Sequence, residues 1–142
     1  MGFPLMLVKL ELGYLELQEN NLDKARSLFQ EGLQDLLRWR DQSFTSCVID
    51  GMAQLAAREG RMERAALLFG TKLWCGFAHI LTIAERAERE AVFAEIRMRL
   101  GAERFEQMGA EGRAMNFTQV LALMKDDDGQ TEQVKSTPHG KS

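Results

Sequence analysis

The chain has 142 residues, of which 45% are hydrophobic and 27% are charged, and it contains only two prolines. This length suits one domain with a buried core, and the composition is that of a soluble, helix-rich globular protein. The formal net charge of −3 excludes the class of strongly basic proteins that hold nucleic acid or anionic membranes by charge.

The first predicted helix covers about residues 4–19, with a proline in its first turn, where the missing N–H is tolerated. One apolar stripe at helical spacing consists of Leu5, Val8, Leu12 and Leu15, and a second consists of Leu7, Leu10, Tyr14 and Leu17. A helix that is apolar on both sides requires neighbours on both sides. The rest of the chain covers one side, so an upstream segment or a second copy should cover the other. The candidates for self-association are Leu5, Leu7, Leu10 and Leu17.

Further helical patterns follow across short polar breaks. Asn20-Asn21 form the first turn, and Gly60 is suited to end a helix because glycine tolerates left-handed dihedrals. Helical periodicity predicts the second, third and fourth helices over about residues 22–40, 43–59 and 62–79.

The last part of the chain predicts three more helices and a tail. Thr82 or a neighbour should cap a helix that reads to Leu100, and a sixth helix follows over about residues 102–113. Asn116 with Gln119 three residues later is a variant of the capping box and starts the seventh helix. We expect a helical domain over residues 1–125 and a disordered polar tail over 126–142, where Val134 is the one aliphatic residue.

One pattern occurs twice, 40 residues apart. Gly13 is followed by Ala25 after twelve positions and by Phe29 after four more, and the same spacings join Ala53, Ala65 and Phe69. These residues resemble tetratricopeptide repeats, in which small and aromatic residues at these offsets let paired helices approach closely and stack. The resemblance implies an all-α fold of tetratricopeptide-like antiparallel hairpins, forming a short right-handed superhelix of about seven helices.

A second resemblance extends over roughly residues 10–124. It is carried by AAREGRMERAALLFG at 56–70, ERAERE at 85–90, LGAERF at 100–105 and EGRAMNFTQVL at 111–121. These runs look like the C-terminal helical region of bacterial signal-transduction ATPases and LuxR-type regulators. The resemblance implies a helical module that follows a nucleotide-binding switch and senses inducers or partners. The ATPase motif GxxxxGK[ST] is absent from this chain.

The candidate binding surface is the concave wall that the first helix of each pair forms in such repeats. The resemblance maps polar candidates for this wall onto Tyr14, Gln18, Asp50, Gln54 and Arg58. The bland alternative is that these are ordinary face residues without a dedicated ligand. Leu10 and Tyr14 stand where some family members use Lys and Asn to clamp a peptide carboxylate, which argues against that mode of capture.

The sequence offers little chemistry for catalysis or metal binding. His79 has no second ligand-type residue near it, and no Ser/His/Asp or Cys/His set recurs, so we expect no enzyme, no cofactor and no metal site. Cys47 and Cys75 form no CxxC motif and suit small buried residues of a reduced cytoplasmic protein, with a disulfide between them as the alternative. The Leu81-Thr82 segment is similar to the start of a LuxR-type DNA-binding domain, but the recognition-helix segment is missing.

These observations predict a non-catalytic protein–protein interaction module, the C-terminal helical-repeat part of a bacterial transcriptional or signalling regulator. The expected partners are an upstream domain or another protein, and a second copy bound through the first helix. The alternative is a small-molecule sensor that holds an inducer on the concave wall near Tyr14, Gln54 and Arg58. We expect no direct contact with nucleic acid or membrane.

Overall fold

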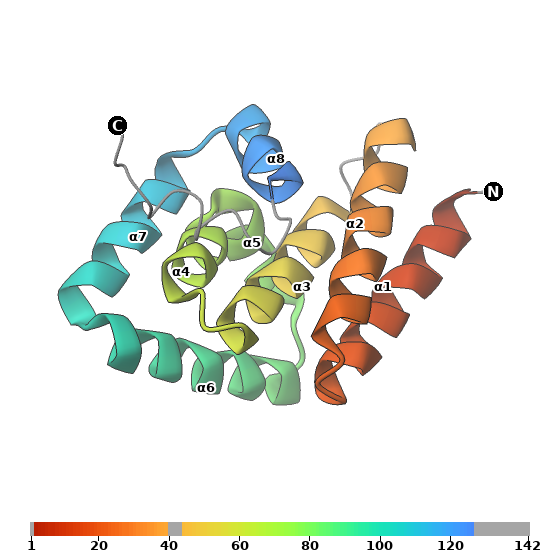
Figure 1. The fold of residues 1–142 in the computed structure, drawn as a ribbon. Coiled ribbons are helices and arrows are strands. Elements are labelled where there is room, and N and C mark those ends of the chain that lie inside the picture. The colour runs from red at the N-terminus through yellow and green to blue at the C-terminus, as the bar shows by residue number, and fades with distance from the viewer. Residues whose placement is uncertain (1, 40–43, 127–142) are drawn as a thin grey trace, which may run out of the picture.

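The computed structural model describes residues 2–39 and 44–126, and these residues form helices joined by short turns (Figure 1). The predicted all-α fold of antiparallel hairpins is confirmed. The elements are α1 (Gly2–Gln18), α2 (Leu22–Trp39), α3 (Thr45–Arg58), α4 (Met62–Gly70), α5 (Lys72–Phe77), the 3-10 helix η2 (Ala78–Ile80), α6 (Ile83–Leu100), α7 (Ala102–Ala114) and α8 (Phe117–Lys125). Of the predicted tail, residues 127–142 lie outside the described residues.

The first two hairpins are α1 with α2 and α3 with α4. Each turn contains one residue in the left-handed region, Asn20 with φ 64° and Gly60 with φ 81°, as the sequence predicts for these two turns. Lys9 on α1 forms an ion pair with Asp35 near the far end of α2, which fixes the antiparallel pairing of these helices. Arg26 on α2 forms an ion pair with Glu59 at the turn of the second hairpin and links the two hairpins.

The ring of Phe29 on α2 fills the space between the two hairpins. A Cβ on Gly13 would lie 2.7 Å from this ring, and a Cβ on Gly51 would lie 2.4 Å from it. The helices therefore approach closely only because both positions are glycines. The repeat pattern points to Ala53 as the small residue of α3, and Ala53 is fully buried, but Gly51 is the residue that makes room for Phe29.

The prediction of one continuous helix over residues 62–79 is wrong, and for this reason the described part of the chain holds eight α-helices instead of seven. The helix stops at Thr71, whose backbone is extended with φ −64° and ψ 151°. The Thr71 hydroxyl donates to the carbonyl of Leu68 and accepts from the N–H of Trp74, so one side chain both ends α4 and caps α5. This break redirects the chain and turns Trp74 toward α3.

The last three helices enclose α4 (Figure 1). Both predicted caps are confirmed, since Thr82 with Glu85 and Asn116 with Gln119 form complete capping boxes. Helix α7 crosses α4 at glycines, and a Cβ on Gly112 would lie only 2.1 Å from the carbonyl oxygen of Leu67.

Side chains of the second helices of the two hairpins hold the end of α8. Arg64 on α4 donates to the carbonyl of Leu123, and Gln30 on α2 donates to the carbonyl of Met124. Carbonyls in the last turn of a helix lack partners within the helix, so these two bonds satisfy groups that α8 cannot satisfy itself. The bonds thereby fix α8 across α2 and α4.

Candidate functional site

The carboxylate of Asp50 on α3 is the most highly connected polar group among the described residues, and its residue is fully buried. It receives hydrogen bonds from four side chains: Tyr14 at 2.8 Å, Gln54 at 2.9 Å, Trp74 at 2.8 Å, and Arg89 through Nε at 3.2 Å and through its terminal nitrogen at 2.5 Å. The Arg89 guanidinium forms the two-pronged pair that suits a carboxylate. These donors come from α1, α3, α5 and α6, so one carboxylate joins four helices.

The electrostatics of this cluster keep its members in fixed protonation states. Burial raises the pKa of Tyr14 well above its usual value, and the adjacent Asp50 charge raises it further. Burial by itself would lower the pKa of Arg89, but the hydrogen bond and charge of Asp50 more than offset this, so its pKa is raised. At neutral pH the cluster is therefore a satisfied internal ion pair with a neutral phenol. It is suited to holding helices together and poorly suited to proton transfer.

Cys47 lies one turn before Asp50 and is half-buried. Burial, followed by the charge of Asp50, raises the pKa of its thiol to about 11. A nucleophilic cysteine requires a lowered pKa, so this thiol is poorly suited to attack a substrate at neutral pH. Both Cys47 and Cys75 are free thiols in the structure.

The five predicted concave-surface residues do not converge on one site. Tyr14 and Gln18 line a cleft of about 370 Å³ against η2 and the start of α6. Gln54 and Arg58 line a second cleft of about 460 Å³ against the later part of α6. Asp50 lies beneath the surface and lines neither cleft. Since Tyr14 and Gln54 both donate to Asp50, the side chains predicted to bind a ligand bind one another.

The uncovered side of α1 differs from the predicted one. Leu10 and Leu17, both predicted to take part in self-association, are 3% and 1% exposed, because this stripe packs into the core of the hairpins. Leu5 and Leu7 are exposed, as the prediction requires. The uncovered surface, called the α1 face below, runs along the other stripe. It consists of Leu5, Val8, Leu12 and Leu15, which are 53%, 51%, 43% and 56% exposed.

Figure 1 shows why this face is open: α1 lies at one edge of the array, with α2 on its inner side. Elsewhere in the described part of the chain, large exposed apolar side chains are Ile80, Ile83 and Met98, which come from η2 and α6. Contiguous apolar patches on a surface mark sites of interaction more often than scattered single residues do. The α1 face is therefore the best candidate for a contact surface.

Two residues of the Asp50 cluster were not identified as partners from sequence. Trp74 was assigned to packing, and Arg89 to an alternating charged run on a solvated helix face. The alternation was correct for its neighbours, because every other residue of 82–90 is exposed, but Arg89 itself is buried. The available signal was that Arg89 has apolar Val92 and Phe93 one turn later on the same helix face.

Taken together, the fold and its surfaces define an all-α protein of stacked helical hairpins with an uncovered edge helix. Comparisons with protein-family models, with curated proteins and with solved structures give no match. Within residues 2–39 and 44–126, no helix is long and apolar enough to cross a membrane. The same residues contain no cluster of three or more His, Cys, Asp or Glu side chains placed to hold a metal ion.

Proposed function

We propose that this chain is a non-catalytic protein-interaction module that associates through the α1 face. The observation that carries the proposal is the α1 face itself, where four aliphatic side chains at helical spacing are each about half exposed. Covering such a stripe removes apolar area from water, which is the main driving force of protein association. The internal use of Asp50, Tyr14 and Arg89 supports a non-catalytic role, because these groups stabilise the fold.

We further propose that the occupant of the α1 face is a second copy of the chain. An isologous contact places the same stripe of both copies across a two-fold axis, so an apolar face meets an apolar face. The charge nearest the stripe that could oppose this, Lys9, is directed to α2, where it pairs with Asp35 and Glu31. The stripe is thus left free for apolar contact.

The wider context remains the one that the sequence resemblance suggests, the helical-repeat part of a bacterial regulator of LuxR or signal-transduction ATPase type. The alternative function, inducer sensing on the concave wall, has weaker support. Its two central hydrogen-bonding residues, Tyr14 and Gln54, already donate to Asp50. A ligand there would have to compete with a buried carboxylate for those donors.

Sedimentation analysis of the intact chain tests the proposal. We expect a dimer at micromolar concentration, and a monomer for the double variant Leu12→Glu/Leu15→Glu, because four carboxylates would then face one another across the contact. Met98→Glu is the matched control, since Met98 is 76% exposed but lies on α6. A wild-type monomer over the whole range, or a variant that remains dimeric, would contradict the proposal, with circular dichroism confirming that each variant is folded.

A further inference from the structure

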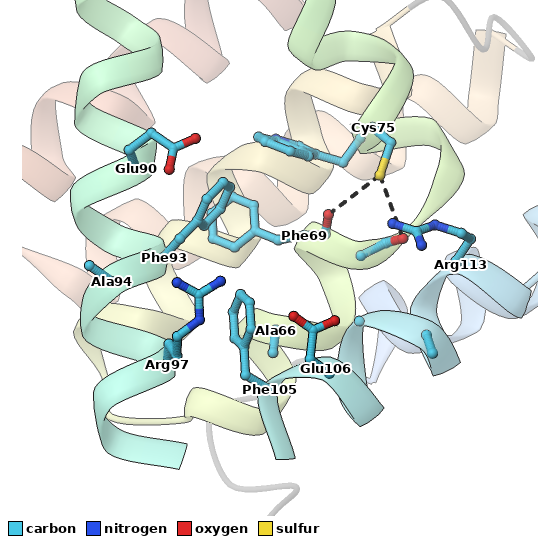
Figure 2. A pocket seen from close by; sticks show the side chains of 14 residues that line it. Ala66, Phe69, Cys75, Glu90, Phe93, Ala94, Arg97, Phe105, Glu106 and Arg113 are labelled. Atoms are coloured by element: carbon cyan, nitrogen blue, oxygen red, sulfur yellow. Dashed lines mark hydrogen bonds between the residues drawn. The ribbon is translucent and has the colours of Figure 1, made fainter. Parts of the chain in front are cut away.

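A cavity of about 450 Å³ opens between α4, α5, α6 and α7, away from the α1 face and from the Asp50 carboxylate (Figure 2). Its volume lies within the range of small-molecule sites. None of the residues named by the sequence analysis as a binding candidate lines it. The cavity therefore requires its own account.

The floor and walls of the cavity are aromatic. Phe69 and Trp74 are buried, and Phe93 is half-buried above them. The three rings pack edge to face, with centroids 4.9 Å apart for Phe69 and Phe93, 5.1 Å for Phe69 and Trp74, and 5.4 Å for Trp74 and Phe93. This geometry fixes each ring against two others, so the floor is rigid and preformed.

A positive group is held in place at the edge of this floor. The Arg97 guanidinium of α6 lies over the ring of Phe105 on α7, 4.8 Å from its centroid, and Figure 2 shows it between Phe93 and Phe105. Stacking on a ring leaves the N–H edge of a guanidinium available to a carboxylate. Arg97 is thus oriented for a ligand without being neutralised by a protein carboxylate.

Two acids and two arginines line the cavity, one of each on α6 and on α7. Helices α6 and α7 diverge from Gly101, with Arg97 and Glu106 nearer this corner and Glu90 and Arg113 farther along their helices. At both depths a positive group on one helix therefore accompanies a negative group on the other. Among the described residues, none of the four side chains forms an ion pair or a hydrogen bond.

We propose that this cavity binds a small zwitterion with an apolar or aromatic side chain, the chemistry of a free amino acid. The ligand carboxylate binds the edge of Arg97, its ammonium group binds Glu106, and its side chain lies on the Phe69 and Phe93 rings. A simple anion would face two unpaired glutamates, and a simple cation would face two unpaired arginines. A zwitterion matches both signs and the apolar floor together. The site is independent of self-association through α1.

Isothermal titration calorimetry of the intact chain with L-phenylalanine, L-leucine, L-methionine and L-tryptophan tests this site. We expect saturable binding of at least one of them, and at least tenfold weaker binding of its N-acetyl and its amide derivative, each of which lacks one charge. Arg97→Gln and Glu106→Gln should each weaken binding at least tenfold. Arg99→Gln is the matched control, because Arg99 lies on the same helix outside this cavity, and it should bind as the wild type does.

Three results would overturn the proposal. The first is no saturable heat with any of the four amino acids at millimolar concentration. The second is equal binding of the N-acetyl or amide derivative, which would show that one of the two charges is not recognised. The third is unchanged binding in both Arg97→Gln and Glu106→Gln. Both residues are exposed, so these variants are expected to fold, and circular dichroism checks this.

Discussion

At the scale of single residues, the carboxylate of Asp50 determines how the hairpins and the later helices hold together. Removing a buried charge from a water-free site is costly only when its partner stays behind, and here the partner is the Arg89 guanidinium. Asp50→Asn should therefore lower the free energy of unfolding by about 3 kcal/mol or more, measured by chemical denaturation. Asp23→Asn, at a fully exposed position on α2, should change it by less than about 0.5 kcal/mol.

A second substitution checks the reason for that loss. If the cost of Asp50→Asn comes from stranding a buried guanidinium, then Arg89→Met should relieve part of it. The double variant should be less destabilised than the sum of the two single variants. Strict additivity would contradict the assignment of Asp50 and Arg89 as one energetic unit.

The raised pKa values of Tyr14 and Cys47 predict a loss of stability at high pH. In both cases the folded state holds its proton more tightly than the unfolded chain, so the stabilisation is complete below the unfolded pKa and disappears as pH rises. For Cys47 this window runs from pH 9.0 to about 11, and for Tyr14 it begins near pH 10. Denaturation curves at pH 8, 9.5 and 11 should show a shallower fall for Tyr14→Phe and for Cys47→Ala than for the wild type.

Part of this residue-scale picture was readable from sequence. Asp50, Gln54 and Tyr14 were correctly singled out as polar residues at inward positions of their helices, because helical spacing alone places them there. Their partners Trp74 and Arg89 are 24 and 39 residues away from Asp50. No local pattern contains that pairing, because it depends on how the chain turns at Thr71 and on where α6 then lies.

At the scale of elements, the crossing of α4 and α7 depends on glycines at the contact. Gly112→Ala would place a Cβ 2.1 Å from the Leu67 carbonyl, and since the obstacle is backbone, the helices must separate. We expect a loss of about 2 to 3 kcal/mol in the free energy of unfolding. Gly109→Ala, one turn earlier on α7 with nothing within 4 Å of the new Cβ, should be neutral or stabilising by up to about 1 kcal/mol. Equal effects of the two variants would contradict this account.

Element boundaries were predictable wherever a side chain satisfies the end of its own helix. The capping boxes at Thr82 and Asn116 are of this kind, since the signal and its effect lie within three residues. The break at Thr71 was missed because apolar periodicity continues past it to Leu73. The neighbouring Gly70 packs against Gly109, with a Cβ that would lie 2.5 Å from its carbonyl oxygen, and this contact exists only in the folded chain.

At the scale of the whole molecule, the edge helix α1 decides whether the chain is complete by itself. The sequence correctly implied that one apolar side of this helix stays uncovered, because both sides are apolar and only one hairpin follows. It did not indicate which side, and Leu10 and Leu17 proved to be buried. The two stripes are similar in composition, so the choice depends on Gly32, whose missing side chain admits Leu10.

The most direct test of the account measures the accessibility of the α1 face in solution. In a Cys47→Ala/Cys75→Ala background, a single cysteine replaces Leu12 on the α1 face or, as control, Ser27 on the exposed side of α2. The account predicts that the rate of thiol labelling at position 12 falls at least tenfold as protein concentration rises from nanomolar to high micromolar, while the rate at position 27 stays constant. Labelling at position 12 that is fast and independent of concentration would contradict it.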